Sequence, residues 1–305
     1  MVRIDEKIKI PTRTPEGFDN ILNNVRALPS VDIDGLLQLP KGRAEPMPLV
    51  ITSIGSRGLE SGREALYAEA FDKAGIAMLI VDSYSARGFT ETVSDQGKFS
   101  FAGSTADALF SLDHLRQDAR FDPKRIALMG YSRGGMVTVM SYDERMQAAV
   151  VGDATRFCAH VALYPPCYLQ WQNPKPTSAP MLAIFGGRDI QAPADVGVAY
   201  AERINHSGGK VETIVYPDLV HSFDTSTPET YRDGVNLGAA LMTVRDNGAM
   251  YERSSGIEAD RGWATFLREV RDARGRKGNI TGYGSLPRDV AVKPIVDFLN
   301  KAFAG

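Results

Sequence analysis

Short apolar runs alternate with longer amphipathic segments along most of the chain. The runs at 48–55 (PLVITSIG), 76–84 (IAMLIVDSY) and 125–130 (RIALMG) are typical of buried strands, and three more follow at 160–165, 180–187 and 211–217. Segments with helical spacing separate them, and each connection suits a right-handed crossover. The pattern predicts an α/β fold, with a mostly parallel central sheet and helices on both faces.

Two of the predicted helices have recognisable ends. Residues 63–75 (REALYAEAFDKAG) finish at Gly75, a predicted C-cap. Residues 104–118 (STADALFSLDHLRQD) begin at Ser104, which we expect to cap the helix, with Asp107 reaching back from the third position. Leucines then recur along one face of this helix.

The two ends of the chain are less regular. We interpret the residues before 31 as a polar leader and 31–42 (VDIDGLLQLPKG) as a strand that ends in a turn. Between about 225 and 285 the rhythm stops, although Asp246-Asn247-Gly248 predicts a hairpin turn. A helix with Pro294 as its irregularity closes the chain. Without a repeat or linker, residues 1–305 are expected to form a single domain with an elaborated segment at about 225–285.

Composition narrows the classes of protein. The chain is 43% hydrophobic and 24% charged, with a formal net charge of −2, which favours a large folded core over disorder and gives no attraction to nucleic acid or an anionic membrane. No run approaches the roughly 20 apolar residues of a membrane span, and the charged start does not resemble a signal peptide, so a cytoplasmic location is expected. Cys158 and Cys167 form no CxxC motif. The sequence leaves two possibilities: Cys158 is buried as a small hydrophobic residue, or the two cysteines form a disulfide.

The strongest chemical motif is Gly130-Tyr131-Ser132-Arg133-Gly134, which fits G-x-S-x-G. A serine nucleophile needs a sharp turn between strand and helix, where flanking glycines let the neighbouring backbone pass. Here the strand RIALM precedes the motif and the helical segment MVTVMSY follows it. We therefore expect Ser132 to be a nucleophile.

A serine hydroxyl needs a base, and the base needs an acid to orient it. His221 follows the strand at 211–217 and is the expected base, whereas His160 falls within a strand and His206 closes a helix. Asp189 follows the strand at 180–187 and is the expected acid. Asp195, read as a helix cap, and Asp218 are the alternatives to Asp189.

An oxyanion hole requires two backbone N–H groups. Arg133 follows the nucleophile and supplies one, and Ser56 or Gly55, in the loop SIGSRG, supplies the other. The chemistry requires no metal and no organic cofactor, and none is expected.

These motifs together resemble the dienelactone hydrolase family of the α/β-hydrolase superfamily. The likeness extends over about residues 31–224 and includes DHLRQDARFDPKRIALMGYSRGG, ALYPPC, FGGRD and YPDLVHSFD. The resemblance implies the α/β-hydrolase fold and hydrolysis of a small ester or lactone. Dienelactone hydrolases proper carry cysteine where this chain has Ser132, and a common His-Gly is here Ile54-Gly55. This chain is thus similar to serine-nucleophile carboxylesterases of the family.

The resemblance also suggests substrate contacts. Arg87 lies near the position of a family arginine that binds a substrate carboxylate, although a structural salt bridge to Asp82 or Glu91 is the favoured alternative. Tyr84 and Tyr164, at strand ends, are candidate pocket walls.

Three functions are compatible with the motifs. A carboxylic ester hydrolase with a Ser132–His221–Asp189 triad is favoured. A prolyl-oligopeptidase-like peptidase is the second, although no propeller-like repeat precedes the motifs. A non-catalytic binding protein on a hydrolase fold is the third, because a fold does not by itself fix a function.

Overall fold

The computed structural model describes residues 4–42, 46–152 and 155–305. Its strands are β1 (Glu6–Arg13), β2 (Ser30–Gln38), β3 (Met47–Ser53), β4 (Ala77–Asp82), β5 (Phe121–Tyr131), β6 (Ala159–Leu163), β7 (Leu169–Trp171), β8 (Met181–Gly186), β9 (Val211–Tyr216), β10 (Thr230–Asn236), β11 (Met242–Val244), β12 (Met250–Glu252) and β13 (Arg276–Thr281). Its helices are α1 (Phe18–Asn24), α2 (Ser61–Ala74), α3 (Phe101–Leu115), α4 (Arg133–Ser141), α5 (Glu144–Val151), α6 (Ala194–His206), α7 (Trp263–Arg274) and α8 (Val292–Phe303), with short 3₁₀ turns η1 (Val25–Ala27), η2 (Ser85–Arg87) and η3 (Gln96–Lys98).

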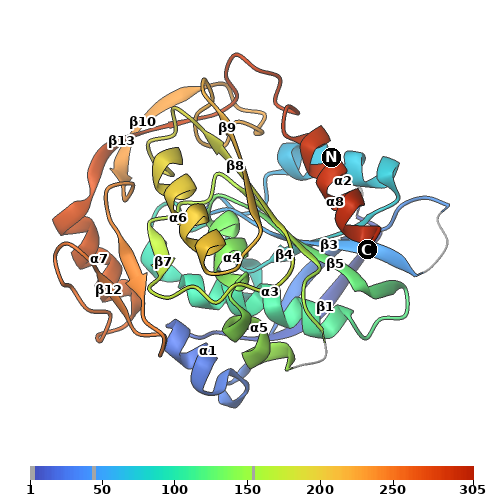
Figure 1. Cartoon of the computed structure of the whole chain (residues 1–305), viewed down its shortest axis with the longest axis horizontal. Helices are drawn as coiled ribbons and strands as arrows, with labels where there is room; N and C mark the ends of the chain where they lie inside the picture. Colours follow the sequence, from blue (N-terminus) through green and yellow to red (C-terminus); the bar gives the residue numbers. More distant parts are fainter. Residues whose placement is uncertain (1–3, 43–45, 153–154) are drawn as a thin grey trace.

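The central sheet has eight strands in the order β1-β2-β4-β3-β5-β6-β8-β9 (Figure 1). β1, β2 and β4 pair antiparallel, and every pair from β4 to β9 is parallel. The prediction of a mostly parallel sheet is confirmed. Because parallel strands are buried on both faces, their sequences read as continuous apolar runs.

Helices cover both faces of this sheet, and successive strand residues point to opposite faces. In β4, Leu79 belongs to the core cluster that includes residues of α1, α3, α4, α5 and α6. Its neighbours Met78 and Ile80 belong to the other cluster, which includes residues of α2 and α8. This alternation is the two-residue period of a strand, and it confirms that helices lie on both faces.

The interpretation of residues before 31 as a leader is wrong. β1 pairs antiparallel with β2 along its whole length, with Ile10 opposite Ile33 and both side chains fully buried. Charged residues are common in an edge strand because one of its sides is exposed to water. Because of these charged residues, the apolar pattern of the sequence did not predict the strand.

The expected start of α3 is also wrong. The helix begins one turn earlier, at Phe101, and its N-cap is Ser100, whose hydroxyl accepts a hydrogen bond from the N–H of Gly103. Ser104 therefore lies inside the helix. Asp107 is fully buried and bonds to side chains outside the helix instead of reaching back to a cap.

Residues 225–285 build a wall beside the sheet. β10 and β13 form an antiparallel ribbon, and β11 lies between β7 and β12 in a small sheet. Figure 1 places this ribbon, β12 and α7 together on one side of the molecule. The predicted turn at Asp246–Gly248 is confirmed, because it connects the antiparallel pair β11 and β12 and Gly248 has a φ of 89°.

Both cysteines have free thiols, so the disulfide left open by the sequence is not formed. Burial raises the pKa of each thiol to about 12, which keeps it protonated and unreactive at neutral pH. In the part of the chain that the structure describes, no helix is long and apolar enough to cross a membrane.

Candidate active site

Three side chains of the site leave the central sheet at the same edge. Ser132 directly follows β5, Asp189 comes three residues after β8, and His221 comes five residues after β9. These strands run parallel, so their carboxyl ends meet on one side of the sheet, where α/β proteins place ligand groups. Residues 89 positions apart are thereby brought into contact.

Ser132 lies in a strained turn between β5 and α4. Its backbone has φ 55° and ψ −118°, outside the regions that a residue with a side chain normally adopts. A Cβ added to Gly130 would lie 2.1 Å from the carbonyl oxygen of Gly134, and one added to Gly134 would lie 2.0 Å from that of Ser53. Only glycine fits at either position. The motif glycines are therefore needed to close the turn against β3.

A chain of two short hydrogen bonds connects Ser132, His221 and Asp189. The Ser132 Oγ lies 2.8 Å from His221 Nε2, and His221 Nδ1 lies 2.6 Å from Asp189 Oδ2. Asp189 is 4% exposed and His221 5%, whereas Ser132 is only partly buried. With the proton on Nδ1, the imidazole donates to the carboxylate and accepts from the serine hydroxyl.

Asp189 is held in place by its own loop. Its Oδ1 accepts hydrogen bonds from the N–H groups of Gln191 and Ala192, both at 2.8 Å, so Oδ2 faces His221. A Cβ at Gly186 would lie 2.5 Å from the carbonyl oxygen of Leu219. Gly186 and Gly187, at the end of β8, thus let this loop pass close to the loop that carries His221.

The alternative residues lie elsewhere. Asp195 is exposed in the first turn of α6 and does not cap it, since the N-cap is Pro193 and no side-chain cap forms; that expectation is wrong. Among the described residues, only Asp189 offers a carboxylate to His221. His160 is buried in β6, where burial lowers its pKa to about 3, and His206 ends α6 with Nδ1 beside the Glu202 carbonyl.

The expected oxyanion-hole residues surround the serine. Arg133 begins α4, where a backbone N–H has no partner within the helix. Gly55 and Ser56 lie after β3 and line the same cavity as Ser132. The hydroxyl of Ser56 and the guanidinium of Arg133 both donate to Gln96 Oε1, at 3.2 Å and 2.9 Å. Gln96 therefore connects the two loops that carry these N–H groups.

A cavity of about 750 Å³ opens above Ser132 and His221. One wall is formed by the loops after β3 and β5, and the opposite wall comes from β10, β13 and α7 in residues 225–285. Trp263, at the start of α7, anchors this wall by donating its Nε1–H to the carbonyl of Gln96 at 2.9 Å. A smaller cavity of about 490 Å³ lies beside α8, away from the triad.

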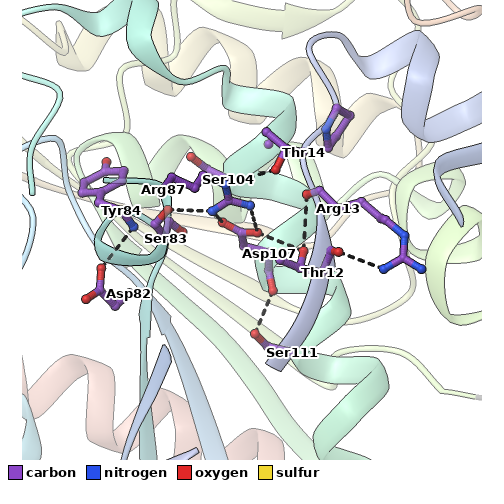
Figure 2. A network of polar contacts seen from close by, with 12 residues as sticks. Thr12, Arg13, Thr14, Asp82, Ser83, Tyr84, Arg87, Ser104, Asp107 and Ser111 are labelled. Atoms are coloured by element: carbon purple, nitrogen blue, oxygen red, sulfur yellow. Dashed lines mark hydrogen bonds and ion pairs between the residues drawn. The ribbon is translucent and has the colours of Figure 1, made fainter. Parts of the chain in front are cut away.

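The suggested substrate contacts are corrected by the structure. Arg87 does not line the cavity; its guanidinium forms a two-pronged ion pair with Asp107, both bonds being 2.9 Å, and donates to Ser83 and Thr14 (Figure 2). The pair is structural, with Asp107 as partner in place of the expected Asp82 or Glu91. Their sequence separation of 20 residues gave no sign of this contact.

The two tyrosines are also outside the cavity lining. Tyr84 is 1% exposed and donates its hydroxyl to the Gly55 carbonyl at 3.2 Å. Tyr164 is fully buried and packs against His221. Both support the site from behind and do not form pocket walls.

Sequence reasoning missed a buried network beside the histidine. Asp224 is fully buried and accepts hydrogen bonds from Arg63 at 3.0 Å, Tyr67 at 2.7 Å and Tyr164 at 2.6 Å. Burial and the Asp224 carboxylate raise the pKa of both tyrosines well above the usual value, so both remain donors. The acidic residue three positions after His221 was the only available signal. No cluster of three or more metal-binding side chains occurs in the described ranges.

The parallel sheet, the strained serine turn and the order Ser132, Asp189, His221 along the chain define an α/β-hydrolase. A model of the dienelactone hydrolase family matches residues 33–243, and the chain belongs to this family.

Known relatives are distant. "Acylamino-acid-releasing enzyme 2" of Oryza sativa subsp. japonica is 23% identical over 209 residues, which cover 54% of this chain and 26% of that protein. "Putative carboxymethylenebutenolidase" of Salmonella typhimurium is 25% identical over 140 residues, covering 44% and 50%. The chain thus spans half or less of these two curated relatives.

Similarity to a solved structure concerns the fold. A crystal structure described as a "Putative Dienelactone Hydrolase" from Klebsiella pneumoniae superposes with a TM-score of 0.51 at 18% identity, covering 72% of this chain and 89% of the other. This match extends the agreement with the α/β-hydrolase fold over most of the chain.

Proposed function

We propose that the protein hydrolyses a carboxylic ester or lactone through an acyl-enzyme on Ser132. The observation that carries the proposal is the hydrogen-bond chain from Ser132 Oγ through His221 to Asp189, at 2.8 Å and 2.6 Å, at the base of a cavity. Membership of the dienelactone hydrolase family supports the same reaction class.

In the first step Ser132 Oγ attacks the substrate carbonyl while His221 Nε2 takes the hydroxyl proton. Asp189 accepts the Nδ1–H and stabilises the imidazolium that forms. His221 then gives the proton to the leaving alcohol as the tetrahedral intermediate collapses. Water then attacks the acyl-enzyme while His221 Nε2 takes a proton from it, and His221 returns that proton to Ser132 Oγ as the bond to the acyl group breaks and the acid leaves.

The negative charge of the intermediate needs fixed donors. The N–H groups of Arg133 and Ser56 are suited to this task, with Gly55 in the same loop as the alternative to Ser56. Loss of one such donor typically costs about 2.7–4 kcal/mol of transition-state stabilisation. The Gln96 bridge keeps the two loops together, which favours a preformed hole.

Covalent labelling tests the proposal. A fluorophosphonate probe should label the wild-type protein at one serine and leave Ser132→Ala unlabelled, and the variant should lose p-nitrophenyl acetate turnover. Ser207→Ala, at the exposed end of α6, is the matched control and should behave as wild type.

Full turnover by Ser132→Ala would overturn the assignment of the nucleophile.

Amide substrates distinguish an esterase from a peptidase. We expect p-nitrophenyl acetate to be cleaved far faster than acetyl-alanine p-nitroanilide, and the reverse order would favour the peptidase.

A further inference from the structure

Three arginines line the cavity on the wall that residues 225–285 add. Arg232 lies on β10, and Arg268 and Arg271 lie on α7. All three are exposed, and none has an ion pair or side-chain hydrogen bond with another described residue. Arg268 and Arg271 lie on the same face of α7, because side chains three or four positions apart in a helix are neighbours. The other residues of that helix that line the cavity are Ala264 and Leu267.

Other arginines of the same segment do have carboxylate partners. Arg245 pairs with Glu258 at 2.6 Å, and Arg261 pairs with Glu269 at 2.7 Å. Both pairs lie outside the cavity lining. The cavity-facing arginines therefore differ from their neighbours in lacking a partner, although carboxylates are common in the segment.

Two of the three carboxylates that line the cavity already have hydrogen-bond or ion-pair partners. Glu60 is 2.6 Å from Arg63, and Asp95 accepts the N–H of Gly97 at the start of η3. Asp233 is the third and last carboxylate among the described lining residues. Six lining residues are arginines, so the cavity carries an excess of positive charge.

Two of these six arginines, Arg133 and Arg57, are more buried than the three on the added wall. Arg133 is 1% exposed, and its guanidinium binds Gln96, Ser104 and the Phe99 carbonyl but no carboxylate. Arg57 is half-buried and lies 3.8 Å from Glu60; burial lowers its pKa, Glu60 raises it, and Arg232 and Arg63 lower it further by repulsion. Arg133 is therefore the buried cation without a carboxylate partner, which is costly, and an anion entering the cavity would reduce that cost.

We propose that this wall is a subsite for an anionic group, so that the preferred substrate is an ester with an oxyanion remote from the scissile bond. The proposal rests on the proposed hydrolysis at Ser132 for its catalytic meaning. A guanidinium binds a carboxylate through two parallel hydrogen bonds, which suits Arg232, Arg268 and Arg271 to hold such a group. The wall is thus a specificity determinant supplied by the elaborated segment, and α7 lies beyond the residues that the family model matches.

Matched esters test the proposal by kinetics. Mono-p-nitrophenyl glutarate and p-nitrophenyl 5-methylhexanoate have the same shape and differ in the terminal carboxylate. We expect a higher kcat/KM for the glutarate, and we expect the glutarate-to-hexanoate ratio to fall about five- to twentyfold in Arg268→Gln/Arg271→Gln, as the loss of two exposed ion pairs allows. Added salt should lower the same ratio in the wild type.

Arg253→Gln/Arg276→Gln is the charge-matched control, because it also removes two positive charges. Arg253 and Arg276 are exposed in the same segment but do not line the cavity. The control should keep the wild-type ratio, whereas an equal fall in both variants would indicate a general effect of net charge and overturn the subsite. A wild-type enzyme without preference for the glutarate would overturn it as well.

Binding separates this proposal from the catalytic one. Calorimetric titration of Ser132→Ala with monomethyl glutarate should give a binding signal that Arg268→Gln/Arg271→Gln removes. If binding is found but Ser132 is neither labelled nor needed for turnover, the proposed function fails and the anion site stands. If Ser132 is labelled and neutral esters are cleaved without any binding of monomethyl glutarate, the anion site fails alone.

Discussion

The ring of Tyr164 packs edge-on against the imidazole of His221, with 4.9 Å between the ring centroids. The hydroxyl of the same tyrosine donates to the buried Asp224 at 2.6 Å. Asp189 fixes one nitrogen of the imidazole, and Tyr164 limits the movement of its ring. The network below the histidine thereby positions the expected base.

Two substitutions separate the roles of the Tyr164 ring and hydroxyl. Tyr164→Phe keeps the ring and removes one donor from a buried carboxylate, so we expect a loss of about 1–3 kcal/mol in unfolding free energy with most of kcat retained. Tyr164→Leu also removes the edge-on ring contact with His221 and should lower kcat further. Urea unfolding and p-nitrophenyl acetate turnover measure the two effects. Equal kcat values in both variants and the wild type would contradict a positioning role.

The ion pair between Arg87 and Asp107 predicts a defect in stability. Arg87→Met leaves a fully buried carboxylate without its cation, which should cost about 3–5 kcal/mol in unfolding free energy. The folded variant should keep its kcat/KM for esters, because Arg87 does not line the cavity. Chemical denaturation and initial rates check both statements.

A second variant controls for general disruption at this position. Arg87→Met/Asp107→Asn removes both charges and should recover part of the lost stability. A selective rise in KM for anionic esters, with normal stability, would instead restore the interpretation of Arg87 as a substrate-binding residue.

Glu64 makes stability depend on pH. Burial raises its pKa to about 7, against the opposing effect of Arg63, and the ordinary value applies in the unfolded chain. The native protein therefore holds a proton that the unfolded chain releases, so stability is full below the ordinary pKa and falls as pH rises toward about 7. Glu64→Gln removes this penalty. We expect the variant to gain up to roughly 3 kcal/mol over wild type at about pH 8 and little at about pH 5.

Urea unfolding of both proteins across this range measures the difference. Glu69→Gln is the control on the same helix, because Glu69 is exposed and its pKa is lowered by Lys73. The control should show no gain at higher pH. A gain from Glu64→Gln that does not change with pH would show that the carboxyl is not titrating in this window.

The sequence alone determined the parallel core, the serine turn and the order of Ser132, Asp189 and His221, the three residues of the proposed triad. These features are local: a strand buried on both faces requires a continuous apolar run, and the turn at Ser132 requires glycine at Gly130 and Gly134 because backbone occupies the space of a Cβ. Each can be read within a few neighbouring residues. The single-domain organisation stays a prediction.

The tertiary structure decided which polar and charged groups meet. Asp107 bonds to Thr12 across 95 positions, and Trp263 bonds to Gln96 across 167. The edge strand β1, the partner of Arg87 and the arginine wall of the cavity all depend on such contacts. Hydrogen bonds and ion pairs between distant residues leave no periodic pattern in a sequence, because they are fixed only when the sheet and its helices bring those residues together.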